Sequence, residues 1–306
     1  MTRYFFTRLA GAIPTLFIII TITFFLMRAA PGGPFDQEQA LAPEIKANLE
    51  SAYGLDQPVW IQYGRYLKSL LHGDFGPSFK YKDFTVTELI GQGFPVTLQL
   101  GVMAIALALF LGVPVGVFAA LHHNSAADTA TMSLAVTGIA IPSFVVLPFL
   151  GLLFGVYLHW LPVAGWEGGS LRRLVLPVIA LALPPLAYIA RLTRGSMLEV
   201  LRSHYIRTAF AKGLPLHSVI FRHALRPALV PVASYLVPAV ASILTGSLVV
   251  ESIAELPGIG RYLVQGAINR DYTLVLGMVI IYSTLLIVMG LLVDFLYAWL
   301  DPRVRL

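Results

Sequence analysis

Six long runs of apolar residues constrain this 306-residue chain more than any other feature of its sequence. A helix that crosses the hydrocarbon core of a bilayer needs about 20 apolar residues. Only 12% of the residues are charged, whereas soluble domains contain about 25%. Charged side chains are therefore too few to cover a water-soluble protein of this size, and the sequence predicts an all-α membrane protein. The six predicted transmembrane helices are residues 9–27, 96–121, 130–158, 174–190, 228–250 and 273–293.

The first apolar run has two interpretations. A basic start followed by an apolar stretch is also the pattern of a secretory signal peptide. The run is long for a signal peptide, and Arg28 stands where a small residue would favour cleavage. We therefore expect the first span to be retained as a membrane anchor.

Basic residues in the connecting segments predict the orientation. Six spans place both termini on one side, and the segment 191–227 contains a single acidic residue, Glu199. Basic loops favour the cytoplasmic side, so we expect this segment and both termini in the cytoplasm, and loop 29–95 outside, with helices at 43–53 and 58–71. The basic residues used are Arg3, Arg8, Arg191, Arg194, Arg202, Arg207, Lys212, Arg222, Arg226, Arg303 and Arg305.

The segment between the fourth and fifth spans has the pattern of two helices joined by a tight turn. Residues 202–212 contain neither Gly nor Pro, Gly213 stands where a left-handed helix cap is favoured, and Pro215 suits the start of a second helix over 215–225. The residues alone leave two interpretations open. The helix pair either lies on anionic lipid headgroups or forms a knob that docks on a cytosolic partner.

The same segment resembles the cytoplasmic coupling motif of ABC-importer permease subunits. That motif is an E-A-A triplet, a glycine and an I-x-L-P-like end; here Arg207-Thr208-Ala209 takes the place of the triplet, Gly213 is the glycine and Leu229-Val230-Pro231 is the end. The triplet departs from the motif at its first two residues, and its R-T-A form resembles the variant of peptide and nickel permeases. The resemblance implies ATPase-coupling roles for Arg207, Thr208, Ala209, Ala211, Lys212, Gly213, Leu214 and Pro215.

Other stretches extend the resemblance over nearly the whole chain. "GDFGPSFKYKD", "ARLTRGSMLEVL", "TGSLVVESIAELPGIGRYLVQGAINRDY" and "DPRVR" look like the B-type permease subunit of oligopeptide importers. The resemblance implies the type I ABC-importer permease fold, with 1–306 as one transmembrane domain in the bacterial inner membrane. It implies as partners a similar second permease, two cytosolic ATPases and an external peptide-binding protein, with an oligopeptide as substrate, membrane lipid around the helices and no nucleic acid.

No phosphate-binding G-x-x-x-x-G-K-[ST] loop is present in the sequence, so we expect this subunit not to hydrolyse ATP. The resemblance implies that ATP and Mg are bound by the partner ATPases and that this subunit carries no cofactor. ATPase closure would push the coupling helix, and the permease pair would then switch between inward- and outward-facing states.

Polar residues in the third and fifth spans are candidates for the translocation path. Hydroxyl groups in membrane helices also satisfy backbone or interhelical hydrogen bonds, so each has a purely structural alternative. A carboxylate within a membrane is functional by default, although this one could also reach the interface from the end of its span. The candidates are Ser143, Tyr235, Ser242, Thr245, Ser247 and Glu251.

Several other classes of site and protein are disfavoured. The chain has no cysteine, which excludes disulfides and thiol catalysis. His122 and His123 are adjacent and would face apart on a helix, so we expect no metal site there. A secondary transporter would need coupling carboxylates at mid-membrane, and a membrane enzyme would need a motif such as H-E-x-x-H or G-x-S-x-G, which the sequence lacks.

Overall fold

The computed structural model describes residues 2–29, 33, 43–81 and 83–300, and helices make up nearly all of this part of the chain. Arg303 and Arg305, used above for orientation, lie outside the described residues. Within these described ranges, five helices are long and apolar enough to cross a membrane, and a bent pair of shorter helices would make a sixth span if it counts as one. They are α1 (Thr2–Ala29), α4 (Val86–Leu121), α7 (Leu171–Leu201), α11 (Val230–Ile253) and α13 (Tyr272–Leu300).

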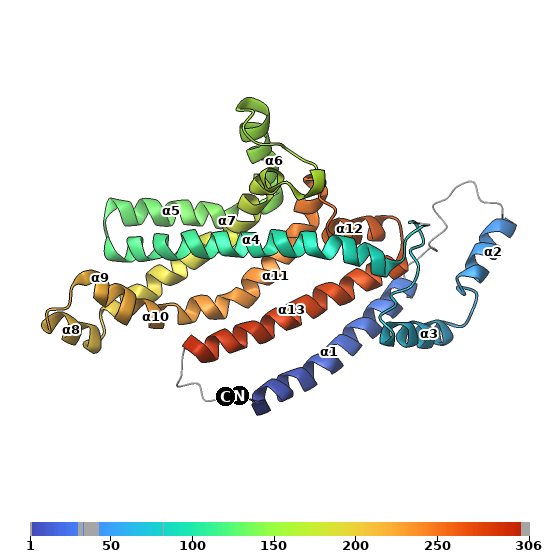
Figure 1. Ribbon diagram of the computed structural model, residues 1–306, viewed down its shortest axis with the longest axis horizontal. Coiled ribbons are helices and arrows are strands. Elements are labelled where there is room, and N and C mark those ends of the chain that lie inside the picture. The colour runs from blue at the N-terminus through green and yellow to red at the C-terminus, as the bar shows by residue number, and fades with distance from the viewer. Residues whose placement is uncertain (1, 30–32, 34–42, 82, 301–306) are drawn as a thin grey trace.

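The third predicted span, residues 130–158, is a bent pair of helices and not one straight helix. The chain forms α5 (Ala126–Ala140), then α6 (Ser143–Leu150) continued by the π-helix η1 (Gly151–Tyr157), and the two parts are bent by 104°. Pro142 explains the break, because it lacks an N–H and pushes the preceding Ile141 into an extended conformation. As a result α6 stands out from the other helices (Figure 1).

The fourth span is longer than predicted, because α7 continues beyond 190 to Leu201. Arg191 and Arg194, which we had placed in a cytoplasmic loop, therefore belong to a membrane-length helix. Two glycines of α4 let it pack against α7 backbone to backbone. A Cβ at Gly116 would lie 2.4 Å from the carbonyl oxygen of Ala190, and one at Gly112 would lie 2.9 Å from a carbonyl of the same helix.

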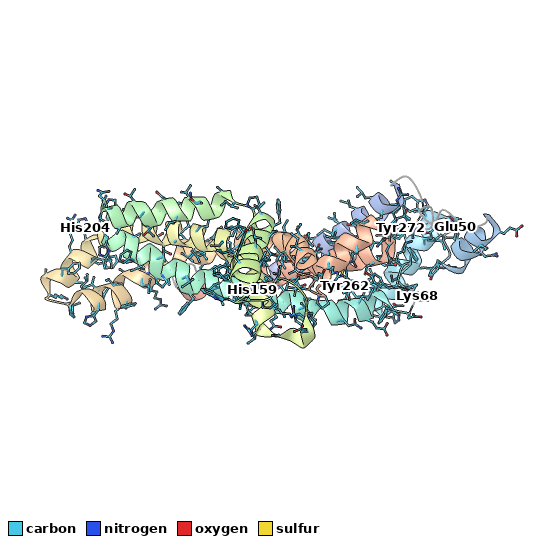
Figure 2. The ribbon with its side chains drawn as sticks, turned by 90° about the horizontal axis from the view of Figure 1, so that it is seen from above. Glu50, Lys68, His159, His204, Tyr262 and Tyr272 are labelled. Atoms are coloured by element: carbon cyan, nitrogen blue, oxygen red, sulfur yellow. The ribbon has the colours of Figure 1, made fainter. Side chains whose placement is uncertain are left out.

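The shorter helices gather at the two ends of the molecule. At one end are α8 (His204–Ala211), α9 (Leu216–Ser218), the π-helix η3 (Val219–Ala224) and α10 (Leu225–Ala228). At the other are α2 (Pro43–Ala52), α3 (Val59–Leu71) and α12 (Ile259–Ile268), and a 3-10 turn, η2 (Glu167–Gly169), precedes α7. Figure 2 shows His204 at the first end, and Glu50 and Lys68 at the second.

The expected helices of the 29–95 loop are confirmed as α2 and α3, although its last ten residues belong to α4. The loop residues 30–32, 34–42 and 82 lie outside the described part of the chain. Helix α1 begins, and α13 ends, on the side away from α2 and α3 (Figure 1), in accord with both termini lying on one side.

Candidate functional site

The end that carries α8 is a compact helical tip, residues 204–228, built around a small apolar cluster. Ile206 and Ala209 of α8 pack against Val219 and Ile220 of η3, together with Met197 near the end of α7. The predicted left-handed turn is present, since Gly213 has φ +76°. This turn folds α8 back onto the second helix, which begins at Leu216 and runs through η3 into α10.

Most of the predicted coupling residues lie on the outer surface of this tip. Leu214 is half-buried, whereas Ala209 is buried and its small side chain serves the packing of α8 on its own chain. The exposed ones are Arg207, Thr208, Ala211, Lys212, Gly213 and Pro215.

Sequence reasoning missed the large apolar side chains that the tip exposes between its basic residues. The sequence signal that could have revealed them is the presence of aromatic residues in a short polar helix pair, because a surface that faces only water carries few large apolar side chains. They are Tyr205, Phe210, Leu216 and Phe221.

The middle of the bundle has a second unusual surface, on the face of α7 opposite α4. The exposed positions of α7 between residues 186 and 201 are Tyr188, Arg191, Gly195 and Glu199, which recur at helical spacing. The exposed positions of α1, in contrast, include Ile13, Phe17 and other large apolar side chains suited to lipid. The exposed stripe of α7 is therefore polar, in contrast to the apolar exposed face of α1.

Helix α11 continues this polar stripe on one side of α7. The ring of Tyr235 stacks on that of Tyr188, with centroids 4.9 Å apart and planes 11° apart. Ser242 and Thr245 are exposed on the same helix. The hydroxyl of Thr245 donates to the carbonyl of Ala241, so it can still accept a hydrogen bond from a ligand.

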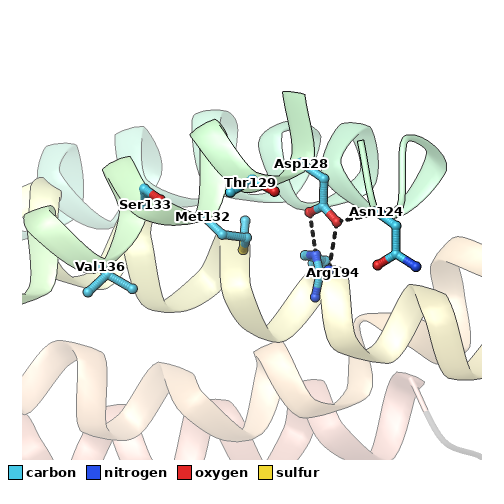
Figure 3. Close-up of a pocket in the computed structure, with 7 residues that line it drawn as sticks. All are labelled: Asn124, Asp128, Thr129, Met132, Ser133, Val136 and Arg194. Atoms are coloured by element: carbon cyan, nitrogen blue, oxygen red, sulfur yellow. Dashed lines mark hydrogen bonds and ion pairs between the residues drawn. The ribbon is translucent and has the colours of Figure 1, made fainter. Parts of the chain in front are cut away.

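Helix α5 continues the stripe on the other side. Arg194 donates to both oxygens of Asp128, from Nε at 2.6 Å and from a terminal nitrogen at 2.7 Å. Asn124 donates its backbone N–H to the same carboxylate. Figure 3 shows this ion pair at one end of a groove of about 530 Å³ that Thr129 and Ser133 also line.

We call this three-helix surface the polar wall. It combines hydroxyl groups, two stacked phenol rings and one exposed guanidinium on adjacent helices, which is suited to a ligand that offers many hydrogen-bonding groups. Its members are Thr129, Ser133, Tyr188, Arg191, Gly195, Tyr235, Ser242 and Thr245.

Three of the predicted path residues lie elsewhere. Ser143 is half-buried at the start of α6, where its hydroxyl would lie 3.1 Å from a Cβ at Gly246. Ser247 is buried and donates to the carbonyl of Leu244. Glu251 is fully buried.

The carboxylate of Glu251 joins α11 to α4 and α12. Thr97 of α4 donates its hydroxyl to one oxygen at 2.7 Å, and the backbone N–H groups of Gly260 and Arg261 donate to the other. These amides belong to the first turn of α12, where a helix favours a negative charge. Glycine is needed at Gly258, because a Cβ there would lie 2.2 Å from the carboxylate.

A second buried carboxylate fastens the same end of the molecule. Asp271 accepts hydrogen bonds from the Ser78 hydroxyl at 2.5 Å and from the backbone N–H of Phe79 at 3.1 Å. Its other oxygen accepts from the N–H of Leu274, in the first turn of α13. Asp271 therefore ties the segment before α4 to the start of α13.

No group of three or more His, Cys, Asp or Glu side chains that could hold a metal ion occurs among the described residues. His123 lies near the Asp128–Arg194 pair, with its Nδ1 3.5 Å from a carboxylate oxygen.

Comparison with known proteins shows similarity over the full length of the chain. A family model described as "Binding-protein-dependent transport system inner membrane component" matches residues 112–306, and its N-terminal counterpart matches residues 1–101. The chain is 55% identical to the oligopeptide transport system permease protein OppB of Escherichia coli (strain K12) over 305 residues, covering 100% of both chains. It is 52% identical to OppB of Haemophilus influenzae, with 100% coverage of both.

Two further matches are more distant. The dipeptide transport system permease protein DppB of Bacillus subtilis (strain 168) is 47% identical over 306 residues, covering 100% of this chain and 99% of that protein. A solved structure titled as inward-facing conformations of the MetNI methionine ABC transporter aligns with a TM-score of 0.59 at 17% identity, covering 70% of this chain and 96% of the other. This last match supports the fold alone.

Proposed function

Because the chain belongs to the family of binding-protein-dependent transport system inner membrane components, we propose that it is a permease subunit of an ATP-driven oligopeptide importer. The full-length similarity to oligopeptide permeases, closer than the similarity to the dipeptide permease, supports the substrate class. In this proposal the chain is not an enzyme, and cytosolic partner subunits bind ATP and Mg and hydrolyse the ATP.

The polar wall is the observation that carries this function. A peptide backbone offers many hydrogen-bond donors and acceptors, and scattered hydroxyls with bridging water can accept peptides of varied sequence. A similar second permease would supply the facing wall and complete the path. The projecting pair of α6 and η1, whose exposed side chains include Phe144 and Phe149, would offer an apolar surface to that partner.

The helical tip would be the site of contact with the ATPases. Its exposed Phe210 and Phe221 provide apolar contact area, and Arg207 and Lys212 provide positive charge around it. Interface cores are enriched in aromatic residues and Arg. This composition favours docking on a protein over a purely lipid-facing role. In this proposal the tip and both termini lie in the cytoplasm.

The opposite end would then face the outside of a bacterial inner membrane. Helices α2 and α3 lie there, beside the buried links made by Glu251 and Asp271. An external peptide-binding protein would deliver its peptide at this end, and the tip would transmit the ATPase movement through α7 to the polar wall.

The test is to isolate a tagged copy of the chain from its native membranes in a mild detergent and to measure subunit ratios by mass spectrometry. We expect one copy of a second permease and two ATPase chains for each copy, and ATP-driven peptide uptake when the complex is reconstituted with its binding protein. Recovery of the chain alone or only with itself would contradict the proposal. A secondary transporter with a lipid-bound tip would then become the leading interpretation.

A further inference from the structure

Two arginines one turn apart on α7 have opposite electrostatic surroundings. Arg194 is neutralised by Asp128 through two hydrogen bonds and is also 3.2 Å from His123. Arg191 is exposed, and within the described residues its only recorded contact of this kind is with an aromatic ring. An arginine side chain stays protonated in proteins, so Arg191 carries a positive charge, and no ion pair to it occurs among the residues that the structure describes.

The geometry around Arg191 holds its guanidinium in place. The guanidinium carbon lies 4.6 Å from the centroid of the Tyr188 ring, and this ring also stacks with that of Tyr235. A cation over an aromatic face is attracted by the ring's quadrupole. A guanidinium that stacks on an aromatic ring keeps its in-plane N–H groups available to a ligand.

The surroundings of Arg191 indicate which anion it can bind. It lies about 15 Å before the end of α7 at Leu201, within the polar wall. Its neighbours on the exposed stripe are Tyr188 and Gly195 instead of the apolar side chains that face lipid on α1. A planar guanidinium matches a carboxylate through two parallel hydrogen bonds.

We propose that Arg191 binds a carboxylate of the transported peptide, primarily the carboxylate of its free C-terminus. This inference rests on the proposed function. The stacked rings of Tyr188 and Tyr235 would support the guanidinium and contact the adjoining peptide bonds. Arg194 is unsuited to this role, because the carboxylate of Asp128 already neutralises its charge. A phosphate of a lipid headgroup is the other anion with suitable chemistry, and the experiment distinguishes the two.

The experiment uses the reconstituted complex with its binding protein and compares ATP-driven uptake of trialanine with uptake of its C-terminal amide. Each peptide is supplied at a concentration that saturates the binding protein, and the free-acid to amide ratio is compared between variants, so any preference of the binding protein cancels. The variants are Arg191→Gln and Arg191→Lys. Arg202→Gln is the matched control, because Arg202 is an exposed arginine at the end of the same helix.

We expect Arg191→Gln to lower the ratio by about tenfold, as loss of a charge-assisted hydrogen-bonded contact would. Arg191→Lys should retain part of the ratio, and Arg202→Gln should leave it unchanged. An unchanged ratio in Arg191→Gln would overturn the inference. An equal loss of uptake for both peptides would also overturn it. If that loss varied with the anionic lipid content of the vesicles, the ligand of Arg191 would be a lipid phosphate. If the wild-type complex takes up neither peptide, the proposed function fails, and this inference fails with it.

Discussion

Each end of the molecule is stabilised by a different kind of interaction. At the α2–α3 end, the buried carboxylates of Glu251 and Asp271 each accept hydrogen bonds from segments far away in the sequence. At the α8 end, an apolar cluster and the Asp128–Arg194 ion pair provide the cohesion. A buried carboxylate bound to several donors permits one arrangement, because any shift leaves those donors unpaired. The apolar cluster instead leaves the outer surface of the tip free for a partner.

The largest effect should come from filling the space beside Glu251. Gly258→Ala places a methyl group 2.2 Å from the carboxylate, so the backbone must move and the hydrogen bonds to α12 weaken. We expect a loss of about 4 kcal/mol in the free energy of unfolding, measured as a lower thermal midpoint of the purified complex. Gly91→Ala is the control, since nothing lies within 4 Å of its Cβ and alanine favours a helix. Equal thermal midpoints for the two variants would show that the hydrogen bonds of Glu251 do not hold this end in one arrangement.

Removal of the second carboxylate should have a somewhat smaller effect. Asp271→Ala leaves the Ser78 hydroxyl and the N–H of Leu274 without their acceptor. We expect a loss of about 3 kcal/mol, seen by thermal unfolding and as faster proteolysis around residues 77–81. Asp83→Ala, an exposed aspartate of the same loop, should change the stability by less than about 0.5 kcal/mol.

At the opposite end, the paired Arg194 can be compared with Arg191, which lies on the same helix. Arg194→Gln leaves Asp128, whose side chain is 4% exposed, without its cation. We expect a loss of about 2 kcal/mol, below the usual range for a fully buried pair because Arg194 is partly exposed. Arg191→Gln, one turn earlier, should be nearly neutral. If the two variants lose the same stability, the assigned difference between the two arginines is wrong.

The smallest effect on stability should accompany a large effect on transport. At Gly213 a β-branched residue is strained by φ +76°, but no atom lies within 4 Å of a Cβ there. We expect Gly213→Val to cost about 1 kcal/mol in stability and to change the outer shape of the tip, so that ATP hydrolysis continues without peptide uptake. Gly213→Asn is the control, because asparagine tolerates this conformation. Normal uptake by the valine variant would show that the turn does not transmit the ATPase movement.

Local sequence was sufficient for much of the fold. The apolar runs predicted α1, α4, α7, α11 and α13, and the order Gly213, Pro215 predicted the turn of the tip. These features depend on residues close together in the chain, such as a sustained apolar composition or a glycine that permits a left-handed conformation. Local sequence did not separate the candidate path residues by their surroundings: Tyr235, Ser242 and Thr245 lie on the polar wall, whereas Ser247 and Glu251 are buried.

The sequence by itself determined that the chain is a bundle of membrane helices with a helical tip, because apolar length and turn residues act locally. Only the tertiary structure decided the 104° bend between α5 and α6 and the surroundings of each charge. Glu251 is hydrogen-bonded to Thr97, which is 154 residues away in the sequence, and Arg194 is hydrogen-bonded to Asp128, which is 66 residues away. Whether a charge is neutralised depends on what folding brings within hydrogen-bond distance. That is why Arg191 and Arg194, equivalent in the sequence pattern, differ in the folded protein.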